Sequence, residues 1–157
     1  MPGKPQGKAR ARTFFNPKLG RMQSITPEQT ILYENLIKLS YQREAHGQMM
    51  DEMPLSVSII ALFAPPKSAS KKKRKAMLDG DIYPDIKPDI DNISKTILDA
   101  LNGLAYRDDK SVAGLSAIKM YGEDERVIVE ISEMPTAKEI LEHERSEVTS
   151  TGITAER

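Results

Sequence analysis

The residues from Leu55 to Phe63 constrain the fold most, because their pattern fits a strand in a sheet. Apolar side chains alternate with Ser56 and Ser58 in the first half, and the second half is apolar throughout. Alternation at a period of two is typical of a half-buried strand, and a short continuous apolar run is typical of a strand covered on both faces. Pro65 and Pro66 end the run, since proline cannot donate to a sheet ladder. We therefore expect a strand over 55–63 whose second half is covered on both faces.

Two helices are predicted beside this strand, one over 26–46 and a short one through the cationic residues 71–75. Each prediction rests on a capping residue at the start and a glycine at the end. These residues are Thr26, with Pro27 at the first helical position, and Gly47 for the first helix, and Ser68 or Ser70 with Gly80 for the second. Residues 81–88 contain two prolines and are expected to be extended or looped.

A third helix is predicted from Asp91 to about residue 102, where Asn-Gly is a fitting end. Its apolar residues have helical spacing and are Ile93, Ile97, Leu98, Leu101 and Leu104. Two strands are then expected over 115–121 and 126–132, with residues 122–125 as the loop of a β-hairpin. Thr136 and Glu139 have the spacing of a capping box, which favours another helix in the following segment.

Length and composition indicate a single globular domain. The chain has 157 residues, of which 29% are charged and 39% hydrophobic. We expect a mobile basic arm over 1–12, a folded domain over 13–133 and an acidic polar tail over 134–157. The absence of cysteine excludes disulfides and thiolate metal sites, and it fits a reducing cytoplasm. There is no apolar run of roughly 20 residues and no secretory signal, so we expect a cytoplasmic protein with no membrane partner.

The formal net charge of zero conceals two basic segments. Every ionisable residue between positions 1 and 27 is basic, residues 71–75 are consecutive cations, and the acids gather late in the chain. Such segments can follow a nucleic-acid backbone, although a solvated charged surface is the plainer interpretation of either one alone. The residues expected to contact DNA are Lys8, Arg10, Arg12, Lys18, Lys71, Lys72, Lys73, Arg74, Lys75 and Lys87.

Three aspartates and one lysine carry the clearest chemical signal. Asp89 and Asp91 are two apart in an expected extended entry to the third helix, so their side chains should point to the same side. Lys95 lies four residues past Asp91, hence on the same helical face. Asp109 joins them only if the turn after the helix folds back, because a helix of about 12 residues spans about 18 Å. Clustered carboxylates hold a hard divalent cation, which activates water and stabilises a phosphoryl transition state.

Each of these residues also has a plainer interpretation. An aspartate before a helix, such as Asp89 or Asp91, is commonly an N-cap. Asp91 with Lys95 can be a surface ion pair worth only about 0.3–0.5 kcal/mol. Asp109 belongs to an Asp-Asp pair that fits ordinary turn chemistry, and Asp99 can be a solvent-facing partner of Lys95.

Three stretches resemble the RusA family of Holliday junction resolvases: KPDIDNISKTILDALNGLAYRDD, KSASKKKRKAMLDG and the basic stretch that ends in FFNPK. The resemblance covers roughly residues 8–132 and implies a small α+β domain, with a short mixed sheet packed by helices, that forms a symmetric homodimer. By position in the motif, the family's essential acids fall on Asp89, Asp91 and Asp109, and its essential lysine on Lys95. The resemblance thus implies three aspartates as metal ligands and all four residues as catalytic.

The function that the resemblance implies is a Mg²⁺-dependent endodeoxyribonuclease that acts in recombination and repair. It would resolve four-way DNA junctions by paired symmetric nicks that leave 5′-phosphate ends. Mn²⁺ is expected to substitute for Mg²⁺, no organic cofactor is expected, and the source is bacterial or phage-encoded. Two alternatives stay open: a nuclease for flaps or forks, and a non-catalytic DNA-binding dimer. The second gains nothing from its aspartates, because carboxylates repel phosphate unless a cation lies between them.

Overall fold

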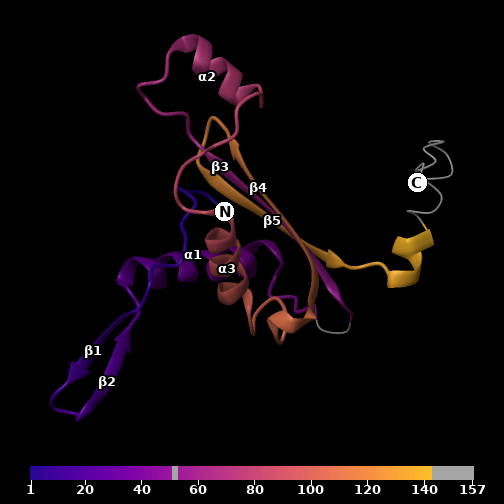
Figure 1. Cartoon of the computed structure of the whole chain (residues 1–157). Helices are drawn as coiled ribbons and strands as arrows, with labels where there is room; N and C mark the ends of the chain where they lie inside the picture. The colour runs from indigo at the N-terminus through magenta and orange to yellow at the C-terminus, as the bar shows by residue number, and fades with distance from the viewer. Residues whose placement is uncertain (51–52, 143–157) are drawn as a thin grey trace, which may run out of the picture.

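The computed structural model describes residues 1–50 and 53–142 and has a three-stranded sheet with two helices against one face (Figure 1). Helix α1 (Glu28–Glu44) packs on helix α3 (Ile90–Leu101), and α3 packs on the sheet. The strands of this sheet are β3 (Leu55–Phe63), β4 (Val112–Tyr121) and β5 (Arg126–Glu133). The expected small α+β domain with a mixed sheet is confirmed.

Strand β3 lies at the centre of the sheet, in the order β4-β3-β5. It runs parallel to β4, with Ile59 beside Ala117, and antiparallel to β5, with Ile59 beside Val129. The predicted β-hairpin of the last two strands is therefore wrong, since β3 separates them. A long apolar strand gains most by taking the central position, where both of its edges are paired. Residues 122–125 instead cross the end of β3, where the Gly122 amide donates to the Phe63 oxygen at 2.9 Å.

One face of β3 is fully buried and the other is half open along its whole length. The inward residues from Leu55 to Phe63 are at most 1% exposed, whereas Ile60 and Leu62 are half-buried. The expectation that the second half of β3 is covered on both faces is thus wrong for the single chain, because helices cover only one face of the sheet. On the open face, Ile60 lies between Ile118 of β4 and Ile128 of β5, and these two partners are exposed.

The helices begin and end close to their predicted limits. Helix α2 (Lys71–Leu78) has Ser70 as its N-cap, whose hydroxyl accepts from the Lys73 amide at 3.3 Å. The cap of α1 differs by one residue, because Pro27 is its N-cap, in place of Thr26. Helix α3, in contrast, begins one residue earlier than predicted, at Ile90, so Asp91 lies inside its first turn.

A hairpin that the sequence patterns did not predict extends away from the domain (Figure 1). It consists of β1 (Arg12–Asn16) and β2 (Arg21–Ile25), which pair antiparallel. The turn between them contains Pro17 and ends at Gly20, whose φ of 61° favours glycine. The Asn-Pro start and glycine end of this turn are the signal by which the sequence could have indicated it.

The first nine residues pack against the domain, which corrects the expected mobile arm. The amino group of Met1 donates to the Val127 oxygen and the Val127 amide donates to the Met1 oxygen, both at 2.9 Å. Pro5 is fully buried, and a Cβ built on Gly7 would overlap the amide of Asn92. The segment therefore behaves as part of the domain as far as Ala9.

The acidic segment after β5 begins as predicted. The carboxylate of Glu139 accepts from the Thr136 amide at 2.7 Å, and the Glu139 amide donates to the Thr136 hydroxyl at 3.3 Å. This capping box starts a helical stretch from residue 137 to 142, and the remainder of the predicted tail lies outside the described residues. Among the helices that the structure describes, none has the length and apolar character needed to cross a membrane.

Candidate active site

An open hollow between α3 and β4 brings together three of the four residues that the sequence singled out. Asp91 and Lys95 reach it from one face of α3, and Asp109 reaches it from the turn that follows the helix. Its volume is about 420 Å³, and we call it the α3–β4 hollow. Its full lining is Ile90, Asp91, Ser94, Lys95, Leu98, Asp99, Asp109, Leu115 and Ala117.

The chain returns to the hollow after α3 because the turn beyond the helix is anchored. Tyr106 is fully buried, and its hydroxyl donates to the Leu98 oxygen at 3.0 Å. Asp108 then caps a short 3-10 turn, accepting from the Lys110 amide at 3.1 Å. Asp108 therefore performs the turn chemistry of the Asp-Asp pair, and its neighbour Asp109 lines the hollow.

The three charged side chains that the sequence singled out in the hollow do not pair with one another. In the described part of the chain, neither Asp91, Lys95 nor Asp109 forms an ion pair within 4.0 Å. The plainer interpretation of Asp91 with Lys95 as a surface ion pair is thus not what the structure has. All three side chains are exposed, so they are open to a ligand.

Asp89 lies outside the hollow, although the sequence predicted that it shares a side with Asp91. It occupies the N-cap position of α3 but accepts no capping hydrogen bond. Its carboxylate instead accepts from Lys87 Nζ at 2.7 and 2.9 Å, and this hydrogen bond lowers the pKa of Asp89. The reason for the difference is the early start of α3: Asp91 is helical, so the alternation of an extended chain does not apply.

Lys119 holds the segment that leads into this helix, and the sequence patterns did not single it out. From β4, its Nζ donates to the Ile86 oxygen at 2.7 Å and lies 3.4 Å from the Pro88 oxygen. It also lies close enough to Asp89 to favour the ionised carboxylate. No local pattern in the sequence could indicate a contact between residues that are so far apart in the chain.

Lys8 is engaged in the fold, in contrast to its predicted place on a DNA-binding surface. Its Nζ lies 2.7 Å from Asp99 Oδ2 and 3.3 Å from Glu34 Oε1, which joins α3 to α1. The hydrogen bond to Asp99 raises the pKa of Lys8. Its backbone is also paired with the Asn92 side chain, which accepts from the Lys8 amide at 3.1 Å. Lys8 therefore neutralises Asp99 at one edge of the hollow.

Comparison with known proteins identifies the family of the chain. Residues 2–132 match the family described as endodeoxyribonuclease RusA. The chain belongs to the RusA family. It is also 42% identical, over 83 residues, to the uncharacterized protein YqaN of Bacillus subtilis (strain 168). That alignment covers 52% of this chain and 58% of YqaN, so the chain spans little more than half of that relative's length.

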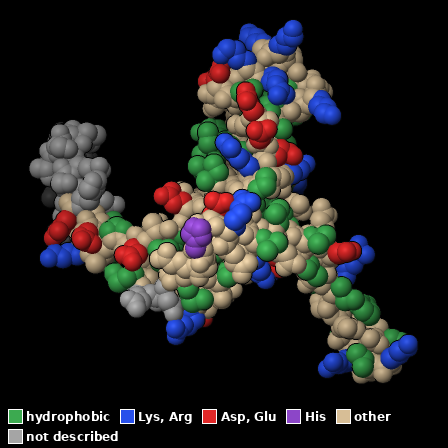
Figure 2. Space-filling model, turned by 180° about the vertical axis from the view of Figure 1, so that it is seen from behind, with side chains coloured by type: hydrophobic (Ala, Val, Ile, Leu, Met, Phe, Trp, Pro, Cys, Tyr) green, Lys and Arg blue, Asp and Glu red, His purple; other side chains and the backbone are tan. Residues whose placement is uncertain are grey.

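Apart from Lys87, the other cations predicted to contact DNA lie on or beside parts of this RusA-family chain that project from the domain (Figure 1). Figure 2 shows blue side chains at the tip that carries α2, where the side chains from Lys71 to Lys75 are exposed. Arg12 and Lys18 belong to the hairpin, and Arg10 precedes it. Lys87 is paired with Asp89, and Lys75 with Asp79.

The donor set of the hollow fits Mg²⁺, which prefers oxygen ligands and usually takes one or two carboxylates together with water and substrate phosphate. Asp91 and Asp109 supply two carboxylates there. A closed cage is absent, because the described residues contain no group of three or more His, Cys, Asp or Glu side chains close enough to hold a metal. An open site of this kind leaves room for a phosphate.

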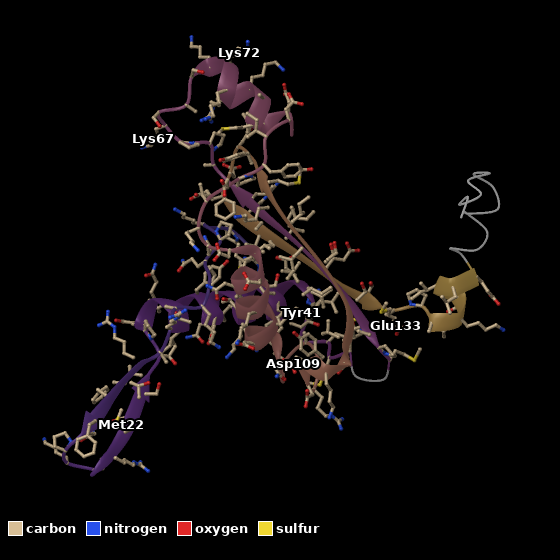
Figure 3. All side chains as sticks on the ribbon, in the orientation of Figure 1. Met22, Tyr41, Lys67, Lys72, Asp109 and Glu133 are labelled. Atoms are coloured by element: carbon tan, nitrogen blue, oxygen red, sulfur yellow. The ribbon has the colours of Figure 1, made fainter. Side chains whose placement is uncertain are left out.

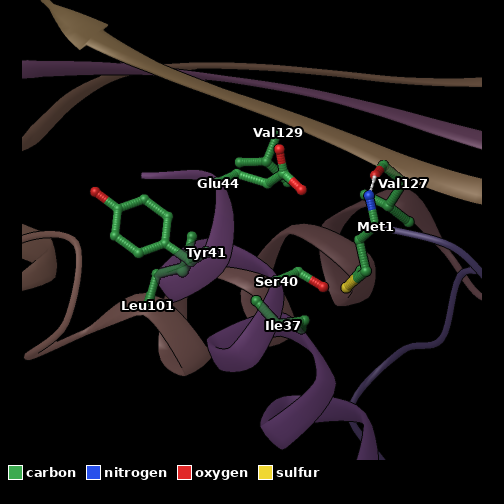
Figure 4. A pocket seen from close by; sticks show the side chains of 8 residues that line it. All are labelled: Met1, Ile37, Ser40, Tyr41, Glu44, Leu101, Val127 and Val129. Carbon is green, nitrogen blue, oxygen red and sulfur yellow. Dashed lines mark hydrogen bonds between the residues drawn. The ribbon is translucent and has the colours of Figure 1, made fainter. Parts of the chain in front are cut away.

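A second cavity of about 110 Å³ lies between α1, α3 and β5 (Figure 4). Its lining is mainly apolar and includes Met1, Ile37, Leu101 and Val127, together with Glu44. It offers no carboxylate pair, and none of the four residues singled out by the sequence lines it. Of these two cavities, the α3–β4 hollow is therefore the candidate active site.

Proposed function

We propose that the chain is a Mg²⁺-dependent endodeoxyribonuclease that cuts four-way DNA junctions. The observation that carries the proposal is the placement of Asp91, Lys95 and Asp109 around one open hollow in a chain of the RusA family. A hollow with acids and a lysine that the described residues leave unpaired suits a phosphodiester, provided that a cation offsets the carboxylate charge.

Asp91 and Asp109 would hold the metal, and Lys95 would hold the scissile phosphate. When bound, Mg²⁺ supplies a water of lowered pKa and polarises the phosphodiester. The Lys95 ammonium donates to phosphate oxygens and stabilises the charge that develops on them. It is suited to this role because it forms no ion pair in the described structure. The products would carry 5′-phosphate and 3′-hydroxyl ends.

Asp89 would be the third ligand, as its position in the family motif implies. In the structure its carboxylate is held by Lys87, whose side chain is 85% exposed, so an exposed ion pair of this kind costs little to break. We propose that Asp89 exchanges Lys87 for the cation when DNA binds, and that Lys87 then contacts phosphate. The Lys119 hydrogen bonds would keep the preceding backbone fixed while this exchange occurs.

The exposed cations of α2 would bind the phosphate backbone of DNA at a distance from the hollow. Five consecutive cations on an eight-residue helix give positive charge on every side of it. Their charge attracts phosphates without reading base sequence. Selectivity for a branched substrate would then arise from how the basic surfaces are spaced, which is a recognition of shape.

Paired nicks require two copies of the hollow, so we propose a homodimer. The open face of the sheet supports a second copy as the partner, because Ile118 and Ile128 are exposed beside Ile60 in the middle of a paired sheet. An isologous contact through this face would relate the two hollows by a two-fold axis. A four-way junction has a similar symmetry.

The test is incubation of the purified chain with an end-labelled mobile four-way junction, in Mg²⁺ or in EDTA, beside Asp91→Asn. We expect paired symmetric nicks that require Mg²⁺ and vanish in the variant, with junction binding retained. Equal cutting of matched three-way and linear DNA would remove the claim for junctions and favour a general branched-DNA nuclease. Tight binding without any cut, with Mn²⁺ tried as well, would leave a DNA-binding protein.

A further inference from the structure

The β1–β2 hairpin is an exposed element that the proposed function leaves without a role. It stands away from the sheet and helices, and Met22 on β2 lies far from both Asp109 and Lys72 (Figures 1 and 3). Apart from Asn16 and Gln23, every side chain of its two strands is exposed. These exposed side chains are therefore not explained by packing within the domain. An isolated two-stranded hairpin is also marginally stable in water, so a bound partner would stabilise it.

The register of the hairpin divides its side chains into two unlike faces. Neighbouring residues on a strand point to opposite faces, and directly paired residues share a face. One face, which we call the arginine face, carries Arg12, Phe14 and Asn16 on β1 and Arg21, Gln23 and Ile25 on β2. The other, the neutral face, carries Thr13, Phe15, Met22 and Ser24.

On the arginine face, the register places Phe14 between Arg12 and Arg21. Phe14 is 41% exposed and sits opposite Gln23. Arg12 is two residues before it on the same strand, and Arg21 lies diagonally across on the partner strand. Asn16 donates to Gln23 at 2.7 Å, which joins the strands beside the ring.

The charge of the hairpin selects the kind of partner that can cover it. Between Arg12 and Ile25 every ionisable residue is a cation, namely Arg12, Lys18 and Arg21. Two identical hairpins brought face to face would repel each other, which disfavours a second copy as the partner of this face. Exposed aromatic rings between cations are the arrangement that binds single-stranded nucleic acid, since bases stack on the ring and phosphates contact the cations.

We propose that the arginine face binds the branch point of the DNA substrate, with Phe14 stacked on a base that has lost its neighbour there. Arg12 and Arg21 then contact the phosphates on either side of that base. A base at a branch point is the natural target, because unstacking costs least where the helix is already interrupted. The inference rests on the proposed function only in taking branched DNA as the substrate.

The chain contains no tryptophan, so a single introduced one reports on this surface alone. Phe14→Trp places the probe on the arginine face, and Phe15→Trp is the matched control on the neutral face of the same strand. Each is titrated with a four-way junction in EDTA, and with linear duplex of the same sequence. We expect the junction to quench the Phe14→Trp emission strongly, duplex to quench it weakly, and Phe15→Trp to change little.

Binding affinity supplies the second measurement, in the same EDTA buffer. Phe14→Ala should bind the junction about tenfold more weakly, which is within the range for loss of one stacked base. Phe15→Ala should bind as the wild type does. Circular dichroism of each variant checks that the domain is intact, which is expected because both side chains are exposed.

Three results would overturn the inference: stronger quenching of Phe15→Trp than of Phe14→Trp, equal quenching by duplex and junction, or unchanged junction affinity in Phe14→Ala. A change of oligomeric state in Phe14→Ala would show that a second copy covers this face, which also contradicts the inference. Because EDTA prevents cutting, these readouts are independent of catalysis. A wild-type chain that fails to cut would refute the proposed nuclease activity. The quenching result would still decide whether the arginine face binds branched DNA.

Discussion

Lys119 Nζ lies 2.7 Å from the Ile86 oxygen, and this hydrogen bond joins strand β4 to the segment that precedes α3. Strand β4 also borders the α3–β4 hollow through Leu115 and Ala117. One strand therefore forms a wall of the candidate site and fixes the backbone that presents Asp89. Lys119 is a positioning residue in this arrangement.

Lys119→Met should loosen the segment before α3 and raise the Mg²⁺ concentration needed for half-maximal cutting. Hydrogen bonds to charged groups contribute about 1.5–3 kcal/mol, so the unfolding free energy should fall by no more than this. The measurements are a Mg²⁺ titration of cleavage and a urea unfolding curve. Lys119→Arg can still donate hydrogen bonds, so its half-maximal Mg²⁺ concentration should be close to that of the wild type. Equal loss in both variants would indicate a role other than donation to these carbonyls.

Lys95→Met should lower the single-turnover rate of junction cutting by about 10²–10³, the usual cost of one donor to a developing oxyanion. Junction affinity should change much less, because many other cations contact the backbone. Lys110→Met is the matched control, since Lys110 is exposed and does not line the hollow. An undiminished rate in Lys95→Met would remove this lysine from the proposed chemistry.

Asp109→Asn should abolish cutting while leaving the fold intact, because the side chain is exposed and Asp108 makes the turn contacts. Loss of one metal ligand should also weaken Mn²⁺ binding, which can be followed by electron paramagnetic resonance without DNA. Asp85→Asn, another exposed aspartate, lies outside the hollow and serves as the control. Equal Mn²⁺ affinity in the two variants would contradict the role given to Asp109.

Replacing Lys72 and Lys73 by Glu should weaken junction binding and reduce the dependence of affinity on salt concentration. The slope of log K against log salt should become shallower by about 0.9 for each phosphate that the variant no longer neutralises. The Mg²⁺ dependence of cutting should stay the same, since α2 projects away from the hollow (Figure 3). Lys138→Glu, a single charge reversal outside α2, is the control. Unchanged affinity in the double variant would remove α2 from the DNA surface.

The ion pair of Lys8 predicts a stability difference at alkaline pH. The partner Asp99 raises the pKa of Lys8 above its usual 10.5, so the folded state binds this proton more tightly than the unfolded state. The contribution is complete below pH 10.5 and is lost as pH rises through the raised pKa. Urea unfolding of wild type and Lys8→Met from pH 8 to 11.5 should therefore show a gap that narrows at the alkaline end. A gap independent of pH would mean that Lys8 acts through packing alone.

Ile118→Glu should dissociate the proposed homodimer, because a buried carboxylate without a partner is costly at an apolar contact. Light scattering coupled to gel filtration measures the mass, with Leu141→Glu as a control on an exposed apolar residue outside the sheet. A monomeric variant should still nick but should lose the pairing of the two cuts. An unchanged mass would place the contact elsewhere.

Local patterns predicted local structure. The structure has Ser70, one of the two caps predicted for α2, and the predicted Thr136–Glu139 capping box. The apolar spacing predicted for α3 is also correct, except that Leu104 lies beyond its end. The position of Asp91 and Lys95 along the same hollow follows from helical spacing in the same way. These features need no knowledge of the rest of the chain.

What the sequence did not predict depends on contacts between distant segments. The position of β3 between β4 and β5 is decided by burial, which local turn signals at 122–125 do not report. Lys8 lies in a basic segment and was therefore predicted to contact DNA. Its ion pair with Asp99 forms only because the N-terminal segment packs on α3, which the local sequence does not indicate. The one-residue shift of the start of α3 separated Asp89 from Asp91, a difference smaller than pattern analysis resolves.

The central place of β3 also governs how the chain is made. Its parallel partner begins at Val112 and its antiparallel partner at Arg126, so the sheet stays incomplete until both have left the ribosome. Until then the apolar strand has unsatisfied edges, and during synthesis such edges favour association between nascent chains. A truncated message that ends before β5 should therefore yield more aggregated protein than the full message does.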